Sequence, residues 1–593
     1  MVCLLWCLSP LVHADPDTLA KDPQWLRLTH LGAGAFGHDS DILDTGFFLD
    51  PRRHPKRELQ ATLAALRNPD TTARREALCR YPARASWLAT QLQDPSLSSG
   101  LQDCELLQDW LPDASTGRLL VVQASGYFGN PASAFGHLLL RVADGDAPPG
   151  RGLLDKGINF GARIPPGDGA FTYIARGLAG GYRAQFSEQL HYLQDHVYTA
   201  NEARDMWAYE LNLNPHKLQL LLLHLWELRD IDFNYYFLRK NCAWRVAELL
   251  AIAFERPVGP THQPYYLPDD VFFALEAFER ESPGLIAHRH FVPSLAYRAA
   301  SRLDQLPVTE RHAIKRFLTE PGQPLPDRLS TDALDYLLDL MDYRLARATE
   351  RERTELIQRK RPVLKARLTR DEAVSPTPPL PPPALGLPPR ALTLRHHSGD
   401  SADSVTLDIA AYEHELINRN RAQLANGALS TAVLRLRRVE DNTRVERLDI
   451  VGTTRLGSPV GRVADDQRET AWRMGVSLAR FAGGRLSATA NAAIGGALTG
   501  RDLTAYALLD GVIWARPERA DLRVELGVLY RPSGARWAAQ WRAQSESLSN
   551  RESAPWRADV ALRWQLNRHI AFTAETAREG NLADHAIGLQ WRW

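Results

Sequence analysis

Hydrophobic and polar positions alternate along residues 391–593 with the period of a β-strand. Polar side chains separate the apolar ones in several runs, including Trp556, Ala558, Val560, Leu562 and Trp564, and at the end Ile587, Leu589, Trp591 and Trp593. Segments of about ten residues with one apolar and one polar face are typical of outer-membrane β-barrels. The pattern therefore predicts an antiparallel β-barrel of about ten to twelve strands. A soluble β-sandwich with one wetted face has the same period and stays open as an alternative.

Upstream of this region the apolar spacing changes. Helical spacing at 58–66 and 74–88 predicts a helical N-terminal region. Apolar or alternating runs at 119–122, 138–142 and 157–161 predict strands, and helices are expected at 200–228 and 242–254. The sequence therefore predicts an α+β multidomain protein, with these parts: a signal peptide at 1–14, a helical domain at 15–115, an α+β domain at 116–290, a helical block at 291–372, a Pro-rich linker at 373–390 and the barrel domain at 391–593.

The compartment is suggested by the first residues. An apolar run begins at Val2, and small residues stand at the −3 and −1 positions of a cleavage site after Ala14, as in an exported protein. We expect a periplasmic protein whose C-terminal domain lies in the outer membrane of a Gram-negative cell. A net charge of +1 gives no basic surface typical of nucleic-acid binding, so we expect no nucleic-acid partner.

Removal of the leader leaves three cysteines. Cys79 and Cys104 lie close in sequence within the predicted helical region, so we expect them to form a disulfide in an oxidising compartment. Cys242 is then the unpaired thiol. Asn241 is a good N-cap, which places Cys242 in the first turn of a helix, where the helix dipole and the adjacent Arg239 and Lys240 favour a thiolate. An inert cysteine buried in a helix core is the alternative.

A thiolate nucleophile requires a base. His137 stands at the mouth of the strand at 138–142, and the preceding Gly136 allows another backbone to approach closely. Asn159, the polar residue of the neighbouring strand, is the candidate for orienting the imidazole. A purely structural histidine at a strand end is the other interpretation. We find no HExxH motif and no paired CxxC, so no metal or other cofactor is expected.

These residues carry a family resemblance. The Ala134-Phe135-Gly136-His137 strand, the Gly157-Ile158-Asn159-Phe160 strand and the Lys240-Asn241-Cys242 helix start occur in that order. Together they resemble permuted papain-like (NlpC/P60-related) thiol enzymes, and more closely the extracytoplasmic domain of the bacterial lipoprotein intramolecular transacylase family, over about residues 116–290. The segments 177–182 and 202–207 are also similar to that family.

The resemblance implies a cell-envelope thiol acyltransferase or lipid-ester hydrolase. Cys242 would be the nucleophile, His137 the general acid and base, and Asn159 the orienting residue, with a lipoprotein or phospholipid as acyl substrate at the outer membrane. Two alternatives stay open: a cysteine peptidase acting on cell-wall peptides, and a non-enzymatic outer-membrane barrel or assembly protein.

Overall fold

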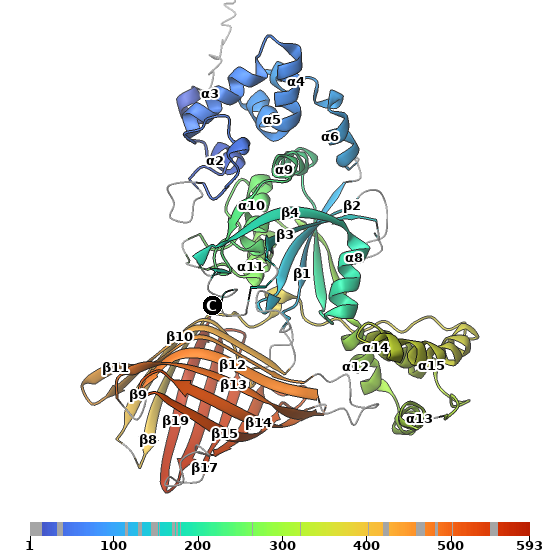
Figure 1. The fold of residues 1–593 in the computed structure, drawn as a ribbon, viewed down its shortest axis with the longest axis vertical. Coiled ribbons are helices and arrows are strands. Elements are labelled where there is room, and N and C mark those ends of the chain that lie inside the picture. The colour runs from blue at the N-terminus through green and yellow to red at the C-terminus, as the bar shows by residue number, and fades with distance from the viewer. Residues whose placement is uncertain are drawn as a thin grey trace, which may run out of the picture. The chain divides into compact units, whose positions relative to one another are not determined.

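The structure is a computed structural model that divides into two compact units (Figure 1). Residues 1–124, 131–198 and 206–292 make up unit 1, and unit 2 contains residues 125–130, 199–205 and 293–593. The structure describes residues 15–32, 40–112, 117–127, 133–143, 152, 154–165, 167–168, 172, 176–177, 179–261, 263, 265–320, 322–400, 402–418, 426–457, 469–480, 484–500, 502–545 and 556–593. The predicted signal peptide at 1–14 lies outside them.

The N-terminal region of unit 1 is helical, as predicted. Its α-helices are α1 (Pro16–Leu19), α2 (Pro23–Thr29), α3 (Pro55–Leu66), α4 (Thr71–Arg80), α5 (Pro82–Gln91) and α6 (Glu105–Trp110). The helix expected at 74–88 is two helices, because the chain breaks at Tyr81 and α5 starts with Pro82, which lacks the N–H that a continuous helix requires there. The predicted disulfide is present, with the Cα atoms of Cys79 and Cys104 5.5 Å apart.

A seven-stranded antiparallel sheet forms the second part of unit 1 (Figure 1). Its spatial order is β6-β4-β3-β2-β1-β5-β7. The strands are β1 (Arg118–Ala124), β2 (His137–Ala143), β3 (Lys156–Arg163), β4 (Tyr182–Leu190), β5 (Met206–Leu211), β6 (Phe233–Tyr235) and β7 (Ile286–Val292). The helices are α8 (His191–Asp195), a π-helical turn (His196–Asn201), α9 (Pro215–Glu227), α10 (Cys242–Phe254) and α11 (Pro268–Glu281).

The predicted strands at 119–122, 138–142 and 157–161 are confirmed as β1, β2 and β3, and the helix at 242–254 as α10. The prediction of one helix over 200–228 was wrong in its first half. There β5 pairs with β1 on one side and with β7 on the other, and α9 begins only at Pro215. Pairing with strands from distant parts of the chain decided the conformation of β5, which local spacing does not record.

Residues 293–372 of unit 2 are the predicted helical block. It contains α12 (Leu295–Gln305), α13 (Val308–Thr319), α14 (Thr331–Leu345) and α15 (Glu350–Leu368), packed around buried residues such as Ile314, Leu337 and Val363. Asp339 of α14 accepts hydrogen bonds from Arg298 and Arg302 of α12, which fixes these two helices together. Among the described residues, no helix has the length and apolar character needed to cross a membrane.

The C-terminal residues form a closed antiparallel barrel of 12 strands, as the alternation predicted. The strands are β8 (Ala391–Gly399), β9 (Ser404–His414), β10 (Gly427–Val439), β11 (Asn442–Leu456), β12 (Glu469–Arg480), β13 (Leu486–Thr499), β14 (Leu503–Trp514), β15 (Arg519–Tyr530), β16 (Trp537–Ser545), β17 (Trp556–Gln565), β18 (Ile570–Glu579) and β19 (Leu582–Arg592). The last strand, β19, pairs with the first, β8, and this contact closes the barrel.

The barrel has its apolar side chains outside and its charged ones inside. On β17, Trp564 is 53% exposed, whereas the neighbouring Arg563 is only 5% exposed. Charged pairs such as Arg473 with Glu525 lie on the inward faces of the strands. A soluble sandwich would bury its apolar face between two sheets, so this arrangement rejects that alternative and matches a barrel surrounded by lipid.

The segment after β9 folds into the barrel lumen. Leu416 and Ile417 pack against inward-facing residues of several strands, among them Leu456, Ala471, Ala493, Tyr506, Leu529 and Ala538. Arg531 donates a hydrogen bond to the Leu416 carbonyl, and Arg563 pairs with Glu415 at 2.5 Å. Residues 415–418, which we call the lumen segment, therefore fill part of the barrel interior.

The C-terminal part of the Pro-rich linker is bound to the barrel. Its residues Pro383–Leu385 form a 3₁₀ turn in which Ala384 is buried. Arg568 donates a hydrogen bond to the carbonyl of Ala384, and Arg592 donates one to the carbonyl of Pro388. The C-terminal end of the linker is thus fixed to the same end of the barrel at which β19 finishes.

Candidate active site

Cys242 is the first residue of α10, and Asn241 is its N-cap. The Asn241 side chain accepts a hydrogen bond from the Trp244 N–H at 3.1 Å. Its amide nitrogen also donates to the carbonyls of Phe237 and Tyr266, at 3.0 and 2.8 Å, which holds the loop before the helix in place. Cys242 is only 5% exposed and shares its buried face with Val246, as the helical spacing predicted. The thiol is therefore fixed at the positive end of a helix.

His137 begins β2, and Asn159 lies on the neighbouring strand β3. Asn159 pairs with Leu139, which is two residues along β2 from His137. Nε2 of His137 donates a hydrogen bond to Oδ1 of Asn159 at 2.5 Å. A neutral imidazole that carries its proton on Nε2 has Nδ1 as its basic nitrogen. Gly136 has φ +96, and a Cβ there would lie 3.1 Å from the Ala124 carbonyl, so the close approach expected of this glycine is present.

The structure brings the thiol and the imidazole together. The Cys242 side chain hydrogen-bonds to His137, and the backbone N–H groups of Leu138 and Ala243 also donate to it. Burial raises the pKa of the Cys242 thiol, but the charge of His137 and these hydrogen bonds outweigh burial and lower that pKa overall. Cys242, His137 and Asn159 thus form one connected chain of contacts. The lowered pKa of Cys242 increases the fraction of the thiol that is present as the reactive thiolate.

Lys240 does not act on the thiol in the way expected from its position. It is buried, with Nζ 3.8 Å from Asp41, 3.9 Å from Glu248 and 4.1 Å from the centre of the Trp244 ring. Arg245 pairs with the same Asp41 and, at 2.5 Å, with Glu248. The expectation that Lys240 favours the thiolate is therefore corrected: its charge is neutralised in a buried ion network that attaches α10 to the N-terminal region.

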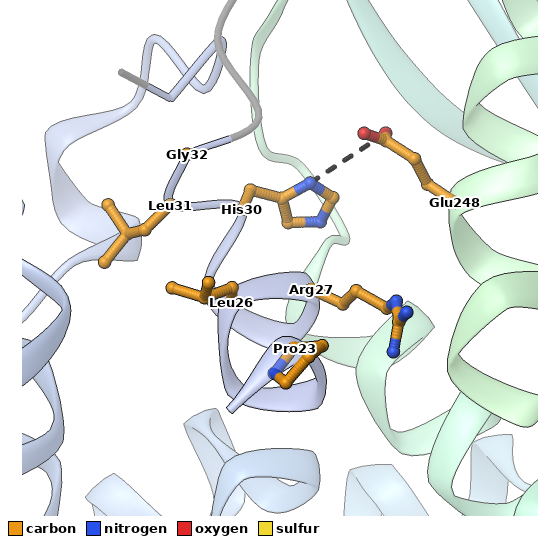
Figure 2. Close-up of a pocket in the computed structure, with 7 residues that line it drawn as sticks. All are labelled: Pro23, Leu26, Arg27, His30, Leu31, Gly32 and Glu248. Carbon is orange, nitrogen blue, oxygen red and sulfur yellow. Dashed lines mark ion pairs between the residues drawn. The ribbon is translucent and has the colours of Figure 1, made fainter. Parts of the chain in front are cut away.

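A small cavity of about 270 Å³ lies beside this network, between α2 and α10 (Figure 2). It is lined by Pro23, Leu26, Arg27, His30, Leu31, Gly32 and Glu248. His30 is 3.9 Å from Glu248, and its Nε2 lies 3.1 Å from Nε2 of His224. Burial lowers the pKa of His30 far below its ordinary value, so the ring is neutral and the contact with Glu248 is a polar contact rather than an ion pair.

Sequence reasoning missed two neighbours of the dyad. The ring of Tyr198, from the π-helical turn, lies 6.2 Å from the ring of His137. Gln123 of β1 donates a hydrogen bond to Asp269 of α11 at 2.6 Å, close to Gly136. Both belong to segments with no motif of their own. The pairing of β1 with β2 places Gln123 here, and the π-helical turn carries Tyr198. Among the described residues, no group of three or more His, Cys, Asp and Glu side chains is arranged to hold a metal ion.

Two family models match parts of the chain that belong mainly to unit 1. Residues 107–266 match the family model described as the Lnb N-terminal periplasmic domain, and residues 17–91 match a domain of unknown function, DUF7843. This chain is a periplasmic domain joined to an outer-membrane barrel. The matched range 107–266 includes Cys242, His137 and Asn159. The description of this family model names a periplasmic domain and does not name a transacylase activity.

The barrel is similar to solved outer-membrane proteins. The KdgM porin shares 11% identity at a TM-score of 0.24, and the comparison covers 34% of this chain and 99% of the porin. The NanC porin shares 13% identity at a TM-score of 0.23, covering 34% and 100%. The Acinetobacter baumannii outer membrane protein Omp33 shares 8% identity at a TM-score of 0.22, covering 35% and 100%. None of the curated proteins matches the chain.

Proposed function

We propose that the periplasmic domain is a thiol acyltransferase or lipid-ester hydrolase, built on a permuted papain-like fold and acting on lipoprotein or phospholipid acyl chains at the outer membrane. The observation that carries the proposal is the contact chain from Cys242 to His137 to Asn159, with the cysteine at a helix N-terminus. Nucleophile, base and orienting group are the three parts that covalent acyl transfer requires.

The mechanism follows from these contacts. The Cys242 thiolate attacks the carbonyl carbon of an ester, and the proposal assigns stabilisation of the developing oxyanion to backbone N–H groups at the start of α10. His137, protonated in this step, gives its proton to the departing alcohol, which leaves an acyl thioester on Cys242. An amine or water then attacks the thioester, His137 accepts its proton, and the thiolate is restored. Asn159 keeps the imidazole in the required tautomer by accepting from Nε2.

A cysteine peptidase would use the same three residues, so the dyad does not separate the two reactions. The barrel favours the lipid reaction, because a membrane anchor keeps the enzyme at a high effective concentration of lipid-linked substrate. Soluble fragments of the cell wall gain no such advantage from the anchor.

The second alternative is a non-enzymatic outer-membrane barrel or assembly protein. The lumen segment speaks against a barrel that conducts solutes, since Leu416 and Ile417 occupy the interior among inward-facing residues of several strands. The ion pair of Arg563 with Glu415 and the hydrogen bond from Arg531 to the Leu416 carbonyl hold that segment in place. We therefore propose that the barrel serves as a membrane anchor for the periplasmic domain.

The test uses the full chain reconstituted into phospholipid vesicles. A diacylglyceryl lipopeptide, a phospholipid and a cell-wall peptide are offered separately, and products are identified by mass spectrometry for the wild type and for Cys242→Ala. The proposal expects loss of one acyl chain from a lipid substrate, abolished in Cys242→Ala. Cleavage of the cell-wall peptide alone would establish the peptidase. If none of the three substrates reacts and the protein conducts ions as single channels in planar bilayers, the non-enzymatic barrel would be established.

A further inference from the structure

An exposed apolar surface lies on the last residue of β4 and the segment that connects β4 to β5. Leu190, Tyr192, Leu193 and Val197 are each between 40% and 46% exposed, whereas His191 and Gln194 of the same segment are buried. We call the four exposed residues the 190–197 face. Leu154, which is 76% exposed, belongs beside it, because the His191 N–H donates a hydrogen bond to the carbonyl of Asp155. Large apolar side chains gathered on one surface indicate a partner that covers them.

This face leads directly to the candidate active site. The residue after Val197 is Tyr198, whose ring lies 6.2 Å from that of His137. Helical residues advance about 1.5 Å each, so Leu193 stands only on the order of 7 Å along the chain from Tyr198. The 190–197 face therefore ends one residue before a side chain that lies beside His137.

We propose that the 190–197 face rests on the surface of the lipid bilayer and presents membrane-held acyl esters to Cys242. The composition of the segment fits a bilayer: between Gln189 and Val197 the one Asp, Glu, Lys or Arg is Asp195, and Asp195 is partly buried. Tyr192 has an apolar ring with a polar tip, the kind of side chain that concentrates at membrane interfaces. Short elements with one apolar face commonly lie in the interface in this way.

The membrane is also the partner that this chain always has nearby. The barrel spans the outer membrane, so the periplasmic domain is tethered to a lipid surface by its own polypeptide. A free protein partner or a second copy has no comparable advantage in concentration. The inference deepens the proposed function, because it names membrane-embedded lipids as the source of the acyl group.

The first experiment measures immersion and needs no activity. The full chain carries serine in place of Cys3, Cys7 and Cys242, and Cys79 and Cys104 are bonded to each other, so none of the native cysteines reacts with the label. The substitution Leu193→Cys then supplies the thiol to which a nitroxide label is attached. In phospholipid nanodiscs, electron paramagnetic resonance compares collisions with oxygen, which enters the bilayer, and with a water-soluble nickel chelate. Arg183→Cys on β4, whose native side chain is 69% exposed, is the matched control.

The proposal expects the label at residue 193 to favour oxygen and the label at residue 183 to favour the nickel chelate. Equal accessibility of both labels to the chelate would overturn it. Dipolar broadening between labels at residue 193 of different copies would also overturn it, in favour of self-association through this face. Neither result depends on whether Cys242 is catalytic, so failure here is distinguishable from failure of the proposed function.

A second experiment connects immersion to reaction. The double substitution L193S/V197S removes two of the four apolar side chains and leaves Cys242, His137 and Asn159 intact. We expect the rate on a membrane-embedded lipid ester to fall about tenfold. The rate on a water-soluble short-chain ester is expected to be unchanged, and an equal loss on both substrates would contradict a role in membrane docking.

Discussion

Replacement of His137 by alanine tests the electrostatic part of the site. His137 is the largest influence that lowers the pKa of the Cys242 thiol, through its charge and its hydrogen bond, against the opposing effect of burial. Without His137, burial dominates and the pKa rises, so less thiolate is present at neutral pH. Because the thiolate is the form that reacts with alkylating reagents, we expect His137→Ala to react more slowly.

The size of the effect follows from the contacts that are lost. A hydrogen bond to a charged group contributes about 1.5–3 kcal/mol, and every 1.4 kcal/mol corresponds to about tenfold in an equilibrium. The backbone donors of Leu138 and Ala243 remain in the variant. We therefore expect the rate of Cys242 alkylation at neutral pH to fall by about 10- to 100-fold. The difference should disappear at high pH, where the thiol is ionised in both proteins.

The assay is a rate–pH profile with iodoacetamide, read by mass spectrometry of the peptide that contains Cys242. His216→Ala is the matched control, since this exposed histidine of α9 lies outside the candidate site. Loss of the His137 ring also opens space beside a buried thiol, which changes how easily iodoacetamide reaches it. The ionisation of the thiol is therefore measured separately, by pH titration of the ultraviolet absorbance of the thiolate with Cys242→Ser as the blank. A titration midpoint that stays in place, or moves to lower pH, in His137→Ala would refute the reasoning.

Three further predictions concern other parts of the chain. Arg84 is fully buried between Glu58 and Glu227, so Arg84→Met leaves two buried carboxylates and should lower the free energy of unfolding by about 3–5 kcal/mol, measured by denaturant titration. Arg67→Met, which breaks an exposed pair with Asp94, should lower it far less, and equal losses in the two variants would contradict the importance of burial. Asn159→Leu should lower kcat of acyl transfer about 10- to 100-fold with little change in KM, and Asn159→Asp should recover part of it; equal losses in both variants would argue against a hydrogen-bonding role. Val560→Arg places a charge on the outward face of β17 and should destabilise the reconstituted barrel by about 2–4 kcal/mol relative to Val560→Leu, whereas an unchanged stability would argue against lipid contact there.

The features that the sequence predicts well are those recorded in a few consecutive residues. Alternation along β17 and β19 is a property of single strands, and it indicated the barrel before any pairing was known. The cap at Asn241 and the apolar spacing behind it predicted both the start and the end of α10. Local rules describe caps and periodicity directly, so no knowledge of distant neighbours was required.

The remaining features depend on parts of the chain that are far apart in sequence. β5 is a strand because β1 and β7 lie on its two sides, which spacing within 200–228 does not reveal. Lys240 lies two residues before Cys242, where a cation is expected to stabilise a thiolate, yet its ammonium group pairs with Asp41 of the N-terminal region. The lumen segment is equally invisible in the sequence, because its apolar residues resemble those of an ordinary loop until the barrel closes around them.

The most direct test of the central claim is to trap the acyl intermediate. The full chain in phospholipid nanodiscs is mixed with a diacylglyceryl lipopeptide, quenched with acid, and analysed by mass spectrometry of the intact chain and of its peptides. The account predicts the added mass of one acyl chain on the peptide that contains Cys242, removed by hydroxylamine and absent in Cys242→Ala. Transfer of an acyl chain with no adduct at Cys242, or with the adduct on another residue, would contradict it.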